Sequence, residues 1–111
     1  MLFLFLALAA GSSPRCTIAD RPVVRRLQDV PASVRKALPT AIANPGEPFQ
    51  ATDVVQAGGR PSLRLICGYA TAKGYVIERE QGGRGYNVGR ISLRRTHGGY
   101  VVDQTSRGVG Q

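Results

Sequence analysis

Hydrophobic and polar residues alternate through much of the second half of the chain, and glycine-rich turns divide the alternation into short segments. An alternation of period two is typical of a β-strand, because successive side chains of a strand point to opposite faces of the sheet. Short connections that contain glycine favour antiparallel neighbours. Strands are predicted at residues 49–56, 62–70, 75–80, 86–95 and 100–103.

The phase of the alternation predicts which side chains enter the core. Segment 62–70 has its larger side chains in one phase, which we expect to face inward: Leu63, Leu65, Cys67 and Tyr69. In segment 86–95 the apolar phase changes between Val88 and Ile91. A one-residue bulge at Gly89 would bring the apolar residues before and after the change to one face, so a bulge is predicted there.

Only residues 29–38 have the pattern of an amphipathic helix. Val30 and Val34 fall on one helical face, Asp29 is placed to cap the first turn, and Pro39 disfavours further helix. One helix followed by strands predicts an α+β fold, in which a helix packs on a curved antiparallel meander sheet of four to five strands. The other face of that sheet is expected to meet solvent.

The first ten residues are apolar and uncharged, and a small, polar run follows at 11–14. This pattern predicts a signal peptide, residues 1–10, with cleavage near Ala9 or Ala10. A membrane-spanning helix would need about 20 apolar residues, so an anchor is not favoured. No lysine or arginine precedes the run, so either the signal is atypical or the true start codon lies upstream. A buried hydrophobic N-terminus is the alternative.

The remainder has room for a single domain with one modest core. We expect an N-terminal arm at 11–28, the α+β domain at 29–103 and a flexible tail at 104–111. Export would place the protein in the periplasm or outside the cell.

The chain has two cysteines, Cys16 and Cys67. In the oxidising compartment that an exported protein reaches, such a pair usually forms a disulfide bond. Closing a loop of about 50 residues would stabilise the fold by roughly 4 kcal/mol. Two separate buried thiols are the alternative.

Positive charge dominates the composition: 15 lysines and arginines stand against 7 acidic residues, for a net charge of +8 and a pI near 10.5. Such a protein attracts polyanions, which in a bacterial envelope are anionic lipid or polysaccharide and acidic proteins. In the cytosol the polyanion would be nucleic acid, a partner that export would make improbable. A GC-rich genome would explain the arginines equally well.

Four arginines form a candidate binding surface: Arg64, Arg84, Arg90 and Arg94. Arg64 and Arg94 have the outward phase of their strands, and the bulge predicted nearby would let Arg90 join them. The alternative is a solvated face with cross-strand salt bridges, each contributing about 1 kcal/mol or less.

Arg84 lies in REQGGRGYNVGR, residues 79–90, a stretch rich in glycine and arginine. A dinucleotide fingerprint needs a third glycine at position 88 and a following helix, but Val88 and a strand pattern come next. No Gly-Lys-Ser or Gly-Lys-Thr occurs, which argues against a phosphate loop. The stretch is therefore predicted to be the tip of a hairpin, with positive φ at Gly82, Gly83 and Gly85.

Candidate catalytic groups are few. Glu78 and Glu80 would share one face of a strand about 7 Å apart, a spacing that can hydrolyse glycosides. Arginines in neighbouring segments are the more ordinary explanation, because opposite charges across strands neutralise each other. His97, the only histidine, has no partner nearby in the sequence for a metal site or a triad. No catalytic residue, metal site or cofactor is predicted.

The segment VPASVRKAL, the turn Asn44-Pro45-Gly46 and the strands after it resemble the helix-then-strands pattern of small PepSY-like bacterial envelope domains, which share a cystatin-like or β-lactamase-inhibitor-like layout. The resemblance covers residues 30–103 as an order of elements. It implies a non-catalytic envelope domain that binds or inhibits another protein, and it implies no site residue.

We therefore expect an exported, non-catalytic binding or inhibitor-like module whose partner is an unidentified protein. The alternative is a basic protein that docks on anionic lipid or polysaccharide through its arginines. The sequence leaves the oligomeric state open.

Overall fold

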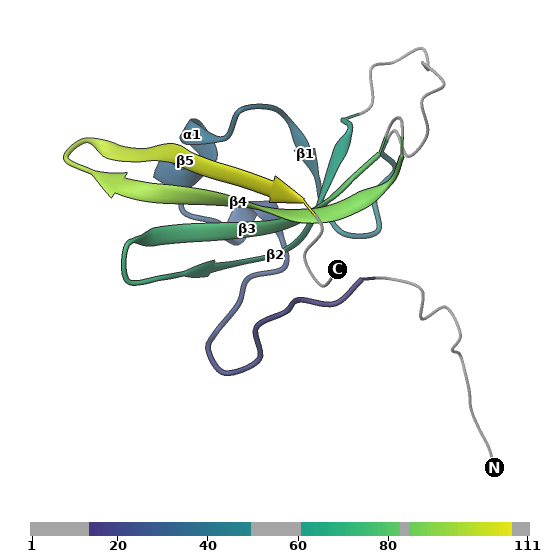
Figure 1. The fold of residues 1–111 in the computed structure, drawn as a ribbon, viewed down its shortest axis with the longest axis horizontal. Helices are drawn as coiled ribbons and strands as arrows, with labels where there is room; N and C mark the ends of the chain where they lie inside the picture. Colours follow the sequence, from purple (N-terminus) through teal and green to yellow (C-terminus); the bar gives the residue numbers. More distant parts are fainter. Residues whose placement is uncertain (1–13, 50–60, 83–84, 108–111) are drawn as a thin grey trace.

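A computed structural model describes residues 14–49, 61–82 and 85–107 (Figure 1). The predicted signal peptide, most of the predicted strand 49–56 and Arg84 lie outside these residues. No helix in the described ranges is long and apolar enough to cross a membrane.

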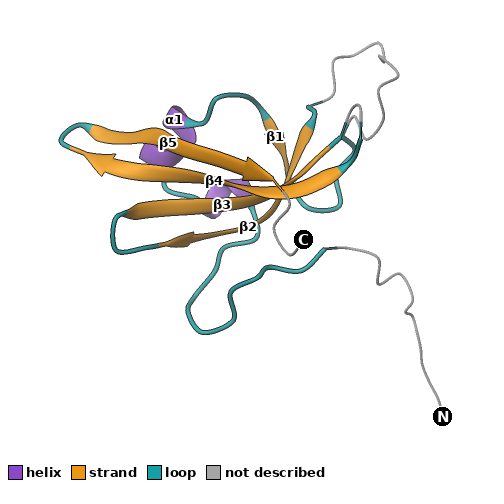
Figure 2. Ribbon diagram, in the orientation of Figure 1, coloured by secondary structure: helices purple, strands orange, loops and turns teal. Residues whose placement is uncertain are grey.

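Five strands form one curled mixed sheet in the order β1-β2-β3-β4-β5 (Figure 2). Their bounds are β1, Ile42–Ala43; β2, Leu63–Ala70; β3, Gly74–Gln81; β4, Asn87–Thr96; and β5, Gly99–Arg107. The antiparallel meander is confirmed for β2 to β5, but β1 pairs with β2 in parallel. A two-residue strand is too short to produce an alternation, which explains why the sequence did not indicate β1.

Helical structure is shorter than predicted. A 3-10 helix (η2, Leu27–Asp29) precedes the α-helix (α1, Ala32–Ala37), and Pro31 rather than Asp29 is the N-cap residue of α1. Leu38 is extended, with φ of −67° and ψ of 140°, because a following proline disfavours the helical conformation. The protein is therefore mostly sheet, and it agrees with an α+β class only in that broad sense.

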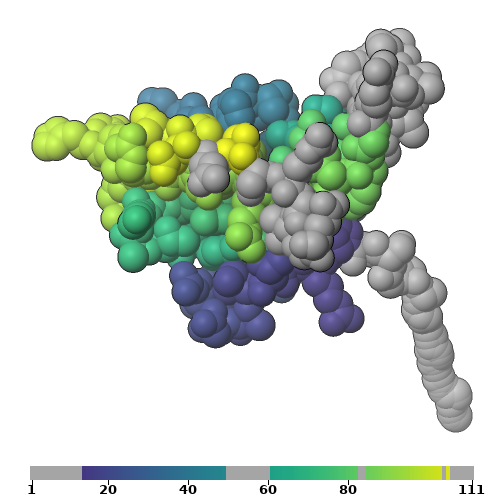
Figure 3. Space-filling view, viewed as in Figure 1, coloured from purple at the N-terminus to yellow at the C-terminus, as the bar shows by residue number. Residues whose placement is uncertain are grey.

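The sheet has two apolar faces. On one face, nine buried residues form the helix-side core: Val30, Val34, Ile42, Leu63, Leu65, Tyr75, Ile77, Ile91 and Leu93. On the other, Ile66, Cys67 and Tyr69 form the arm-side cluster, against which side chains of the arm, residues 14–26, pack. Figure 3 shows the arm, in purple, lying against the sheet. The expectation that the second face is open to solvent is therefore wrong for the part beneath the arm.

A β-bulge in β2 corrects the predicted phase. The register with β3 shifts between Leu65 and Cys67, so Ile66 is an extra residue. Leu65 belongs to the helix-side core, whereas Cys67 and Tyr69 belong to the arm-side cluster. The four side chains expected on one face are thus divided between two.

The bulge predicted at Gly89 is absent from the described pairing of β3 with β4, which keeps one register from Gly74 opposite Arg94 to Gln81 opposite Asn87. The change of apolar phase has another cause: Val88 packs with the arm-side cluster and Ile91 with the helix-side core. The register shift that β4 does have lies between Ser92 and Leu93, in its pairing with β5.

Strand β5 extends further than predicted. β5 runs to Arg107 because its ladder with β4 continues to the pair of Gly89 with Arg107. Residues 104–107 are therefore strand rather than tail, and 108–111 lie outside the described ranges.

At two positions the backbone conformation or a close contact requires glycine. Gly85 has a φ of +85° in the turn between β3 and β4, a conformation that favours glycine. The predicted positive φ is thus found at Gly85 but not at Gly82, and Gly83 is outside the described residues. A side chain at Gly74 would place its Cβ 1.9 Å from the Leu93 carbonyl oxygen, so this close strand contact requires glycine.

Candidate functional site

Two buried carboxylates lie on β3, on the face that the arm covers. Glu78 is 0% exposed and Glu80 is 5% exposed. The register places Arg64 of β2 opposite Glu80, and Arg90 of β4 opposite Glu78. Buried carboxylates need hydrogen-bond donors or cations, because removing an unpaired charge from water is costly.

Arg64 neutralises Glu80 through two parallel hydrogen bonds. Its Nε donates to Oε2 at 2.7 Å and its Nη2 donates to Oε1 at 3.1 Å. The hydroxyl of Tyr86 donates to the same Oε1 at 2.7 Å. This is the cross-strand neutralisation that the sequence suggested for the carboxylates.

The same contacts shift two pKa values. Burial, followed by the hydrogen bond to Glu80, raises the pKa of Tyr86 to about 12. The hydrogen bond to Glu80 raises the pKa of Arg64, against the opposing effect of burial. The Arg64 guanidinium therefore remains charged.

Arg64 is held by two further contacts. Its Nη1 donates to the carbonyl oxygen of Glu47 at 2.9 Å. Its guanidinium carbon lies 4.2 Å from the centroid of the Phe49 ring, a distance typical of a cation–π contact. The position of the guanidinium is thus fixed from several sides.

Glu78 is satisfied differently, by donors rather than by an ion pair. The backbone N–H of Thr17 donates to Oε1 at 2.9 Å, and both the Thr17 hydroxyl and the Tyr69 hydroxyl donate to Oε2, the latter at 2.7 Å. Burial, and then the bond to Glu78, raises the pKa of Tyr69. No salt bridge joins Arg90 to Glu78 in the described residues, and Arg90 Nε is buried without a hydrogen-bond partner there.

The predicted disulfide is confirmed. Cys16 and Cys67 are bonded with an S–S distance of 2.04 Å and a Cα–Cα distance of 5.8 Å. The bond fixes the arm beside Thr17, which explains how donors from the arm reach Glu78. The sulfurs lie within 4.8 Å of a Glu78 oxygen, but a disulfide does not supply the thiolate ligands that a metal site requires.

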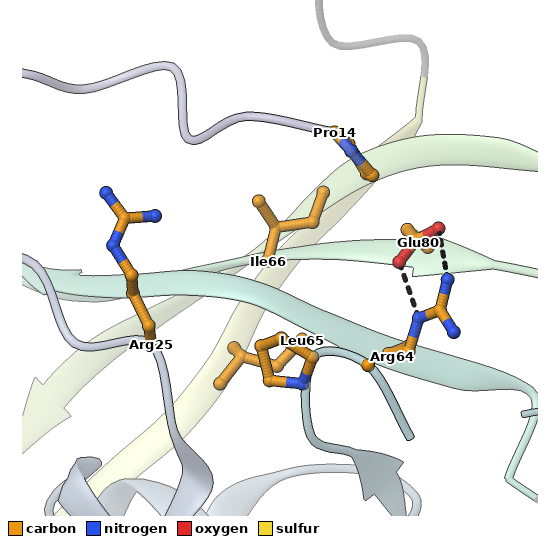
Figure 4. A pocket seen from close by; sticks show the side chains of 8 residues that line it. Pro14, Arg25, Arg64, Leu65, Ile66 and Glu80 are labelled. Atoms are coloured by element: carbon orange, nitrogen blue, oxygen red, sulfur yellow. Dashed lines mark hydrogen bonds and ion pairs between the residues drawn. The ribbon is translucent and has the colours of Figure 1, made fainter. Parts of the chain in front are cut away.

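A pocket of about 320 Å³ opens between the arm, the turn after β1 and the sheet. Eight residues line it: Pro14, Arg25, Pro45, Gly46, Arg64, Leu65, Ile66 and Glu80. Figure 4 shows the Arg25 side chain on one side, the Arg64–Glu80 pair on the other and Ile66 between them. Arg25 is exposed, and its side chain has no hydrogen bond or ion pair with any described residue.

The arginines predicted as a binding surface have different environments. The alternation of β4 places Arg90 and Arg94 on the arm-side face, which Arg64 shares. Arg64 lines the pocket, whereas Arg94 is exposed and lies 3.7 Å from an Asp103 oxygen. His97 is exposed in the turn between β4 and β5.

The sequence did not indicate Arg25 as a site residue. The arm has no regular period, and Arg25 is one of several arginines in it, so no local signal distinguishes the one that lines the pocket.

No protein-family model, no curated protein and no solved structure matches this chain.

Proposed function

We propose that this chain is an exported, non-catalytic module that binds another protein through the pocket between its arm and its sheet. The observation that carries the proposal is that two guanidiniums line one pocket: Arg64, fixed by Glu80, and Arg25, which has no partner among the described residues. A concave surface with an exposed cation on one side and a fixed cation on the other is suited to an anionic group of a partner.

The disulfide supports export, because such bonds persist in oxidising compartments. The resemblance to PepSY-like envelope domains also supports an envelope module, and it stays a prediction. The helix-on-sheet layout of those domains also stays a prediction for this chain, in which α1 has one fully buried side chain, Val34.

The environment of the carboxylates supports a non-catalytic role. Glycoside cleavage requires two carboxyl groups that are open to a sugar and to water. Glu78 is fully buried and its oxygens accept bonds from fixed donors, while Glu80 is held by Arg64 and Tyr86. Neither group is placed to exchange a proton with a substrate.

The alternative function is docking on anionic lipid or polysaccharide. It is favoured by the net charge of +8 and by the arginines that share the arm-side face with Arg64, namely Arg90 and Arg94. This mode would depend on summed charge rather than on the pocket, so it would weaken strongly with salt.

The test uses the protein without residues 1–10, immobilised and exposed to an envelope extract of its source organism. Retention is compared at about 0.1 M and about 1 M salt, between which the Debye length falls from about 10 Å to about 3 Å. The variants are Arg25→Ala and the matched control Arg26→Ala, which removes the same charge from the adjacent, exposed residue that does not line the pocket.

We expect a discrete protein to be retained, with part of the retention surviving high salt, and we expect Arg25→Ala to weaken it more than Arg26→Ala. Retention of anionic lipid or polysaccharide alone, lost at high salt and reduced equally by both variants, would contradict the proposal and favour the alternative.

A further inference from the structure

We infer that the pocket binds a carboxylate carried by an acidic segment of the partner protein, with an apolar neighbour of that carboxylate resting on the floor of the pocket. This inference rests on the proposed function and adds the chemical class of the ligand.

The side-chain N–H donors of the pocket lining all belong to guanidiniums. An arginine has five N–H groups, and Arg64 donates three of them: two to Glu80 and one to the Glu47 carbonyl oxygen. Two N–H groups of Arg64 are therefore left for a ligand. Arg25 donates none of its five to a described residue. The planar, two-oxygen carboxylate matches the fork of N–H groups that a guanidinium presents.

Charge favours a monoanion over a phosphate dianion. The lining has two cations, Arg25 and Arg64, and one anion, Glu80, which leaves a single net positive charge. A carboxylate neutralises this charge, whereas a dianion would leave the pocket negative and close to Glu80. The Glu80 oxygens already accept bonds from Arg64 and Tyr86, which limits their repulsion of an incoming carboxylate.

The rest of the lining is apolar. Pro14 and Pro45 border the pocket, and Ile66, which is 5% exposed, lies between the two arginines (Figure 4). A pocket of about 320 Å³ is near the lower limit for small-molecule sites, and it can accommodate one or two side chains of a partner. The net charge of +8 makes an acidic protein the complementary partner.

The probes are peptides with a shared sequence. The first has a central glutamate between leucines and blocked ends, the second has glutamine in place of glutamate, and the third has the glutamine together with a free C-terminal carboxylate. Inorganic phosphate is the fourth probe. Binding is followed by NMR through the backbone amide of Ile66 and the side-chain Nε–H of Arg25, which line the pocket.

We expect the glutamate peptide to shift these signals. The glutamine peptide should bind at least about tenfold more weakly, because a charge-assisted hydrogen bond is lost. Arg25→Ala should reduce the affinity of the glutamate peptide to that of the glutamine peptide. Arg26→Ala should leave the affinity of the glutamate peptide within about twofold of its wild-type value. Binding of the third peptide in preference to the first would overturn the inference, because the carboxylate would then belong to a chain end and not to an acidic segment.

Equal binding of the glutamate and glutamine peptides, tighter binding of phosphate, or indifference to Arg25→Ala would overturn the inference. Its failure can be told apart from failure of the proposed function. A protein retained from the extract independently of Arg25 overturns the carboxylate site but leaves a protein-binding module. Peptide binding without any retained protein supports the site and contradicts the function.

Discussion

The disulfide is expected to account for a large share of the stability of this small domain. Cys16 and Cys67 are 51 residues apart, and the chain-entropy model assigns a loop of that length about 4 kcal/mol. Domains generally have only about 5 to 15 kcal/mol of free energy of unfolding, so removal of the bond should lower the stability by a substantial fraction.

The effect should be largest where the arm meets the sheet. Beyond the disulfide, the arm is attached by the bonds of Thr17 to Glu78, by a bond from Arg21 Nη1 to the Ala70 carbonyl oxygen and by a two-residue bridge between Val24 and Gly68. In that bridge the Val24 N–H donates to the Gly68 carbonyl at 2.8 Å, and the Gly68 N–H donates back at 2.9 Å. Ile18 and Val23 also pack against the arm-side cluster. Without the bond, these few contacts must hold the arm against its gain in conformational entropy.

The variant is Cys16→Ser combined with Cys67→Ala, because Cys16 is half-buried while Cys67 is fully buried and a hydroxyl there would add a desolvation cost. Urea unfolding should show a loss of about 4 kcal/mol, and wild type with its disulfide reduced should give a similar value. Hydrogen exchange should show earlier loss of protection at the Val24 and Gly68 amides, which bond the arm to β2, than at the amides that pair β3 with β4. A loss below about 1 kcal/mol, with both amides still protected, would refute the reasoning.

Three further outcomes test the polar groups of the arm-side face. The folded state raises the pKa of Tyr86 to about 12, above the ordinary value of about 10. The contribution of the protonated tyrosine to stability is therefore complete below about pH 10 and is lost as the pH rises to about 12. Tyr86→Phe should flatten this part of the pH dependence of the urea midpoint. Arg64→Ala leaves Glu80 buried without its cation and should lower the free energy of unfolding by about 3 kcal/mol. Arg94→Ala removes an exposed ion pair and should lower it by less than about 0.5 kcal/mol. Similar losses in the two variants would contradict a larger contribution from the buried pair. Glu78→Gln offers one acceptor oxygen where two now accept, so a donor is left unpaired and about 1 to 3 kcal/mol should be lost; unchanged stability would contradict this network.

The strand positions and the cysteine pair were predictable because they depend on local signals. Alternation and glycine turns define β2 to β5 within a few residues, and each of two cysteines has one possible intramolecular partner. The faces were not predictable in the same way. The bulge at Ile66 moves the second half of β2 to the other phase, so that Leu65 packs on one face of the sheet and Cys67 and Tyr69 pack on the other, and the alternation in the sequence does not indicate this shift.

One part of the candidate site could be predicted from local signals and another part could not. The Arg64–Glu80 pair follows from adjacent antiparallel strands, and opposite charges at facing positions are an ordinary arrangement. The environment of Glu78 does not follow from its strands, because two of its donors belong to Thr17, 61 residues away along the chain. Such a contact depends on the path of an arm that has no period to reveal it.

The arm forms one side of the pocket as well as covering Glu78. It supplies Pro14 and Arg25 to the pocket, and both lie within ten residues of Cys16, whose bond to Cys67 fixes the arm against β2. The other wall, Arg64 with Glu80, belongs to the sheet and does not depend on the disulfide. The fixed cation therefore belongs to the sheet, whereas Arg25 belongs to the arm and directly follows Val24, whose bridge to Gly68 pairs the arm with β2. The disulfide and this bridge together hold the arm side of the pocket against β2.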